Sequence, residues 1–356
     1  MPYLGARPTD VPVGNLNNNQ NLLINGSMLI NQRGGGAAIT AASTYNNNDD
    51  SYTLDRFNLV SDGNDIVDVT RSTTAPDGGS TSSIALDVET DDKKFGIVQF
   101  IEAKDSHPAI GQTVSLQFKA KVSNARLTDV RAAVISWDGT ADSVTSDVVN
   151  AWENASTVPT LATNWTYENT AASLALTTSF ATYTIEGIAV DTSSTNNIAV
   201  FIWSQTETNN VGDILYITDV QLEVANVAGT YDRRSYTEDW NMCQRYFQSS
   251  IDHDVTKAGN GSQDNSNAFV LFGDDQGDYQ YHHVFHQEMF ADPTVTVVNN
   301  SGSGAATGVL RNFNDGSDSA ITDASGKSSI RIQDGSLTAS HANDGLFGCW
   351  VADGEM

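Results

Sequence analysis

The sequence predicts an all-β protein in which two β domains are joined by a short helix. The chain has 356 residues, a length that favours about two domains. Charged residues make up only 17%, and the polar residues are mostly Asn, Ser, Thr, Asp and Gly, which favour turns over helices. Within many short segments, apolar and polar residues alternate one by one, which is the period of a half-buried strand. Clusters of turn-forming residues separate these segments.

Residues 1–20 are predicted to form an extended arm. They contain three of the seven prolines and few apolar residues, so they offer little to a core. Tyr3 and Leu4, in the stretch MPYLG, are candidates for docking on a larger particle, and disorder is the alternative. The stretch has neither a basic start nor an apolar centre, so no signal peptide is expected there.

Residues 21–228 are predicted to form a jelly-roll β-sandwich. The clearest strand is TVSLQFKAKV at 113–122, whose apolar residues alternate with polar ones, so one face meets a core and the other meets water. The apolar residues of 22–30 are expected to form the first strand. In DILYITDVQLEV the apolar phase slips, which predicts a β-bulge near Thr218 and Asp219. About eight strands without helices favour the jelly-roll type of sandwich.

Residues 229–250 are predicted to contain the connecting helix. Ser235 followed by Glu238 has the spacing of a capping box. One stripe of the expected helix would pack against the sandwich or against copies of the chain, and it consists of Tyr236, Trp240, Cys243 and Phe247. Residues 251–356 return to β patterns with polar loops, which predicts a second, smaller β domain.

The composition excludes several classes of protein. The formal net charge of −26 repels phosphate backbones, so no nucleic-acid binding is expected. The longest apolar run, IAVFIW at 198–203, is too short for a membrane helix, so no membrane insertion is expected. Cys243 and Cys349 are far apart and are expected to be buried free thiols.

Aromatic residues in loop-like segments are the best candidates for a binding function. Trp152, Trp165 and Tyr167 would bind glycans if their rings were exposed, because aromatic rings stack on the apolar faces of sugars. The alternative is that these rings anchor their loops onto the core.

Other motifs give little support for chemistry. His282, His283 and His286 are expected on the polar face of a strand, and the alternative is a metal site shared between chains at an oligomer axis. The sequence contains no nucleophile elbow, P-loop or Cys/His nucleophile arrangement, so an enzyme is not expected and no cofactor is predicted.

Four motifs in order resemble a family of bacteriophage virion proteins. They are NLLINGSMLINQRG at 21–34, YTLDRF at 52–57, ITDVQLEV at 217–224 and RSYTEDWNMCQRYFQ at 234–248. The family comprises tail fibre, tail spike or appendage subunits with a jelly roll like that of carbohydrate-binding modules. FGCWVADGEM at 347–356 resembles its closing strand, and MPYLG resembles fibre N-termini that attach to the particle. The resemblance spans nearly the whole chain and implies a location in the virion.

Related carbohydrate-binding modules often hold a structural calcium between the first and last strands. Their acids after Asn-Gly are replaced here by Ser27, Met28 and Leu29, and only Asp219 matches the pattern, which argues against calcium. Arg33 and the Asp55–Arg56 pair are expected to form ion pairs near the sandwich edge.

The leading functional expectation is a tail fibre or appendage subunit that presents its β domains to host-surface glycans. It would form a homo-oligomer, expected to be a trimer, with Trp240 and Phe247 packed at the axis, and its arm would dock on other particle proteins. One alternative is a capsid-decorating or head-fibre protein. Another is a polysaccharide depolymerase, which would need a pair of carboxylates in a sugar-binding groove.

Overall fold

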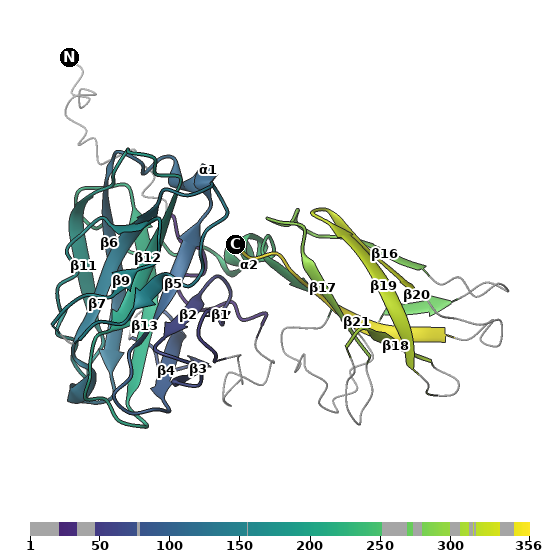
Figure 1. Ribbon diagram of the computed structural model, residues 1–356, viewed down its shortest axis with the longest axis horizontal. Helices are drawn as coiled ribbons and strands as arrows, with labels where there is room; N and C mark the ends of the chain where they lie inside the picture. The colour runs from purple at the N-terminus through teal and green to yellow at the C-terminus, as the bar shows by residue number, and fades with distance from the viewer. Residues whose placement is uncertain are drawn as a thin grey trace, which may run out of the picture.

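The computed structural model describes residues 21–33, 47–76, 79–154, 156–250, 269–272, 280–299, 307–312, 316, 318–334 and 345–356. It confirms the predicted fold class: a jelly-roll β-sandwich, a short helix and a second β domain. Figure 1 shows the two β domains side by side, with helix α2 (Tyr236–Cys243) between them. The predicted docking arm, with Tyr3 and Leu4, lies outside the described residues.

The sandwich consists of two antiparallel sheets. The six-stranded sheet has the order β1 (Ser51–Tyr52), β2 (Asn58–Ser61), β5 (Phe95–Ile101), β12 (Asn197–Ser204), β7 (Val130–Trp137) and β10 (Trp165–Tyr167). The five-stranded sheet has the order β11 (Ala181–Ala189), β6 (Thr113–Val122), β13 (Ile214–Glu223), β4 (Ser83–Val88) and β3 (Val67–Ser72). Smaller elements are α1 (Ala103–Ser106), a 3-10 turn (Ala125–Leu127) and the pair β8 (Val149–Ala151) and β9 (Thr160–Leu161).

The alternating pattern of β6 places its apolar residues in the core between the sheets. Val114, Leu116 and Phe118 are fully buried, and so are Leu215 and Leu222 of the neighbouring strand β13. Lys119 and Lys121 of β6 are only partly buried, on the outer face of the sheet. The predicted period-two strand is therefore confirmed.

The predicted bulge in the last strand of the sandwich is also confirmed. The register between β13 and β6 shifts between Thr218 and Gln221, and Asp219 has a φ of 53°. The shift lets both apolar sets of β13 face the core. Gly26 lies against this bulge: its carbonyl accepts from the Val220 N–H at 2.9 Å, and an added Cβ would lie 2.1 Å from the Val220 carbonyl oxygen.

The prediction of a first strand at 22–30 is wrong, because residues 21–33 form turns and bends. The buried side chain of Asn25 explains this. Its carbonyl oxygen accepts from the backbone N–H groups of Leu29 at 2.9 Å and Ile30 at 2.8 Å, and its amide donates to the Ile30 carbonyl at 2.9 Å. These bonds satisfy backbone groups that a strand would offer to a neighbouring strand.

Helix α2 begins with the predicted capping box. The Ser235 hydroxyl accepts from the Glu238 N–H at 3.3 Å, and the Glu238 carboxylate accepts from the Ser235 N–H at 3.0 Å. The helix ends at Cys243, so the expectation that it continues to Phe247 is wrong. Phe247 instead opens strand β14 (Phe247–Ser249), where it is paired with Asp353 of β21 (Gly345–Asp353). Pairing with a distant strand prevails over the helical pattern.

Replacing Ser235 with alanine is expected to lower the free energy of unfolding by about 1 kcal/mol, because the Glu238 N–H loses its acceptor. Urea unfolding followed by tryptophan fluorescence would measure this difference. Thr237→Ala, at an exposed position two residues further along the chain, is the control and should change stability much less. Equal effects in the two variants would contradict the capping role.

The second domain is built around strand β21. Its eight-stranded sheet has the order β14, β21, β18 (Val309–Asn312), β19 (Asp318–Gly326), β20 (Ser329–Asp334) and β16 (Gln280–Val284), and β15 (Phe269–Phe272) and β17 (Thr294–Val298) also pair with β21. Its core includes Met289, Leu310, Leu346 and Trp350. Both cysteines are buried and free, as predicted. In the described part of the chain, no helix has the length and apolar character needed to cross a bilayer.

Candidate functional site

The outer face of the six-stranded sheet is covered by an aromatic layer. Strands β5, β7 and β12 bury residues on both faces, which explains why IAVFIW is continuously apolar. Residues 138–154 and 156–164, which contain β8 and β9, pack over this face. We call the covered rings the aromatic layer; they are Phe100, Trp137, Trp165, Phe201 and Trp203.

The three candidate glycan-binding residues take part in this packing. Trp165 is 5% exposed, its ring centroid lies 5.1 Å from that of Trp137, and its indole N–H donates to the Thr145 carbonyl at 2.9 Å. Trp152 and Tyr167 are half-buried and pack against the aromatic layer. In this structure Trp165 therefore has no open face for a sugar. The packing of the three rings agrees with the alternative, in which they anchor their loops onto the core.

Gln205, which the sequence did not single out, fixes the covering segment to the aromatic layer. Its side-chain oxygen accepts from the Trp203 indole N–H at 2.8 Å. Its amide donates to the carbonyls of Asn154 and Thr157, each at 3.0 Å. No sequence pattern pointed to this residue, because its partners in the covering segment lie 51 and 48 residues away along the chain.

Asp219, the candidate metal ligand, is surrounded by cationic side chains. It is 2% exposed, and its carboxylate lies 2.9 Å from the Lys119 ammonium and 3.6 Å from the Arg233 guanidinium, and accepts from the Ser80 hydroxyl. These two cations supply positive charge where a bound metal ion would. Among the described residues, no three His, Cys, Asp or Glu side chains form a group that could hold a metal.

We expect a chelator to leave the thermal unfolding midpoint unchanged, because Lys119 and Arg233 neutralise Asp219. Lys119→Met should instead lower the free energy of unfolding by about 1–3 kcal/mol, since a buried carboxylate loses a partner. Differential scanning fluorimetry with EDTA, and then with added calcium, measures both effects. A midpoint that falls with EDTA and recovers with calcium would contradict this expectation.

The histidines lie at the edge of the second domain. His282 and His283 belong to β16, but the strand ends at Val284, so His286 follows it. The rings of His283 and His286 are 5.9 Å apart, and partial burial lowers the pKa of His283. The metal site shared between chains stays a prediction.

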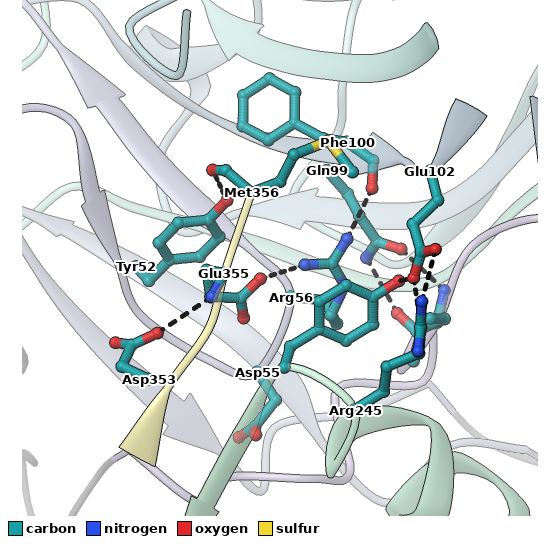
Figure 2. A network of polar contacts seen from close by, with 12 residues as sticks. Tyr52, Asp55, Arg56, Gln99, Phe100, Glu102, Arg245, Asp353, Glu355 and Met356 are labelled. Atoms are coloured by element: carbon teal, nitrogen blue, oxygen red, sulfur yellow. Dashed lines mark hydrogen bonds and ion pairs between the residues drawn. The ribbon is translucent and has the colours of Figure 1, made fainter. Parts of the chain in front are cut away.

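A buried ionic junction joins the sandwich to the second domain (Figure 2). Beyond β21 the chain turns back to the sandwich, where Glu355 pairs with Arg56, which is 1% exposed. Arg33 bonds Asp353 at 2.5 Å and Glu355 at 3.1 Å. The predicted pairing of Arg33 and Arg56 with acids is confirmed. The sequence did not identify their partners, Asp353 and Glu355, although both acids lie in the motif FGCWVADGEM.

Glu102 forms the other half of the junction. Its carboxylate accepts from Arg245 at 2.5 and 2.9 Å and from the Tyr246 hydroxyl at 2.5 Å. Burial raises the pKa of Glu102, but these bonds and the nearby charges of Arg245 and Lys104 outweigh burial and lower the pKa to about 2. The Arg56 guanidinium lies 3.5 Å from the centroid of the Tyr246 ring, so the two halves touch.

Apolar side chains from three parts of the chain close the junction. They come from the opening segment, from the region of α2 and from the second domain, and they are Ile24, Ile30, Cys243, Tyr246 and Phe290. Of the predicted stripe, Cys243 is buried here, Trp240 packs against the cluster, and Tyr236 is 45% exposed and stacks on Trp240. The stripe residues on α2 therefore pack within one chain.

The fold defines the class of this protein as a jelly-roll β-sandwich with an appended β domain. No protein-family model and no curated protein matches the sequence. Similar solved structures include the enzymatically active domain of tailspike protein 4 of bacteriophage CBA120, with 17% identity and a TM-score of 0.33. The match covers 58% of this chain and 21% of that chain.

Two sugar-binding proteins show a comparable likeness. The carbohydrate-binding module TmCBM61, solved with β-1,4-galactotriose, has 13% identity and a TM-score of 0.31, and the match covers 58% of this chain and 99% of the module. A putative sugar-binding protein from Bacteroides thetaiotaomicron has 14% identity and a TM-score of 0.34 over 58% of this chain and all of that chain. Likenesses of this degree assign neither a ligand nor a role to this chain.

Proposed function

We propose that the chain is a structural and adhesive subunit of a bacteriophage particle, a tail fibre or related appendage, and not an enzyme. The observation that supports this most is the buried junction, in which ion pairs and an apolar cluster hold two β domains together. A projecting subunit needs such a connection to keep its domains in a fixed arrangement. The four-motif resemblance supports the virion setting.

In this proposal the sandwich contacts host-surface glycans, residues 1–20 dock on the particle, and the subunit is a homotrimer. Light scattering of the full chain and of a chain without residues 1–20 tests the assembly. Both chains should be trimers by light scattering. When each is offered to assembling particles, only the full chain should be found in the purified particles. A stable monomer whose arm is dispensable for incorporation would contradict the proposal.

Adhesion and catalysis are separated by a second experiment. The purified full chain should bind host cells that carry their surface polysaccharide and fail to bind cells stripped of it. Incubation with the isolated polysaccharide should release no new reducing ends. Reducing ends that accumulate with time would overturn the non-catalytic part of the proposal.

A further inference from the structure

A groove of about 530 Å³ lies on the outer face of the five-stranded sheet, away from the aromatic layer. It lies between strand β6, the start of β11 and the segment that follows β3. Its lining includes Ala75, Pro76, Lys119, Lys121, Phe180 and Thr182. The volume falls within the range of about 300–1,000 Å³ found for small-ligand sites.

The groove gathers positive charge in a chain that carries a net charge of −26. Its titratable lining side chains are Lys119 and Lys121, which lie two residues apart on the outer face of β6. Lys119 pairs with Asp219, but Lys121 has no carboxylate partner among the residues that the structure describes. The Lys121 ammonium instead lies 5.2 Å from the ring centroid of Phe180 and 4.9 Å from that of Tyr216.

This combination of groups selects a class of ligand. The half-buried ring of Phe180 can pack against the apolar face of a sugar, and hydroxyls of Thr178, Ser179 and Thr182 line the same groove. An ammonium without a counter-ion favours a carboxylate. A neutral sugar would leave this charge unused, and a free phosphate would leave the aromatic ring unused.

We propose that this groove binds a carboxylated saccharide, such as a uronate or sialate unit of a surface polysaccharide; this inference rests on the proposed glycan-binding function. A second hollow of about 230 Å³ shares Lys119 and Thr182 and extends to Thr230 and Tyr231, which gives room for a further sugar unit. Asp219 also lines this hollow, and its carboxylate is paired with Lys119. The net negative charge does not prevent binding, because the Debye length at physiological salt is about 8 Å and the ligand responds mainly to charges close to it.

The test uses the full chain and a panel of acidic oligosaccharides made of galacturonate, glucuronate, mannuronate or sialylated units. Each is paired with its methyl ester, which removes the charge and keeps the sugar. Calorimetry should detect binding of at least one acidic member, weakened about tenfold by esterification. Lys121→Gln and Phe180→Ala should each weaken binding by about tenfold.

Lys327→Gln is the matched control, because it makes the same charge change at an exposed turn of the second domain and should leave binding unchanged. Circular dichroism verifies that each variant is folded. Acidic sugars bound equally by Lys121→Gln and Phe180→Ala would overturn the groove. Binding of neutral sugars alone would overturn it and leave the adhesive function standing. Binding of no sugar in the panel would also overturn it, and the cell-binding experiment would then decide the adhesive function separately.

Discussion

Arg56→Met is expected to lower the free energy of unfolding by about 3–5 kcal/mol, the usual cost of removing one partner of a buried ion pair. The change leaves the Glu355 carboxylate buried with Arg33 as its remaining partner. It also removes the donor to the Phe100 carbonyl, which Arg56 bonds at 2.7 Å, and the contact with the Tyr246 ring. Guanidinium-chloride unfolding followed by tryptophan fluorescence measures the loss.

Lys93→Met is the control for Arg56→Met. Lys93 pairs with Asp62 at 3.2 Å, but both side chains are more than a third exposed, so its loss should cost at most about 1 kcal/mol. The double variant Arg56→Met with Glu355→Met should recover much of the stability, because neither charge is then buried. A single Arg56→Met variant no less stable than the control would contradict the role given to the junction.

Glu102→Gln is expected to destabilise the protein by about 3 kcal/mol at neutral pH and by much less in acid. The folded-state pKa of Glu102, about 2, lies below its ordinary value of 4.5. A lowered pKa means that the carboxylate stabilises the fold above about pH 4.5 and loses this effect as the pH falls towards 2. The stability difference between wild type and Glu102→Gln should therefore shrink across this interval.

This difference should be measured between variants, because other buried acids act in the opposite direction. Burial raises the pKa of Glu355 and of Asp239, so their ionisation destabilises the fold as the pH rises. These contributions are shared by wild type and Glu102→Gln and cancel in the comparison. Asp62→Asn, which removes an exposed acid, is the control and should stay within about 1 kcal/mol of wild type. A difference for Glu102→Gln that is constant with pH would rule out the proposed origin of its effect.

Local periodicity allowed much of the fold to be predicted. The alternation in β6, the capping box at Ser235 and the phase slip at Asp219 each depend on neighbouring residues, and each was confirmed. The errors have long-range causes. The opening segment is a turn because of the buried side chain of Asn25, and Phe247 is in a strand because β21 is its partner.

The same distinction applies to the functional candidates. Arg33 and Arg56 stood out in the sequence, but their acidic partner Glu355 lies 322 and 299 residues further along the chain. The burial of Trp165 depends on a segment that folds over the sheet, which composition does not reveal. That Lys121 lies against two aromatic rings, with no carboxylate partner among the described residues, is likewise visible only when its neighbours in space are known.

The return of the chain from β21 to the sandwich sets an order of events during synthesis. Domains fold as the ribosome delivers them, N-terminal first. Arg56 emerges 299 residues before Glu355, so a nascent sandwich carries an arginine whose partner has not yet been made. The junction can close only after Glu355, two residues beyond β21, has been made. Until then the arginine of the folded sandwich lacks this carboxylate, so the two domains become joined at the end of synthesis.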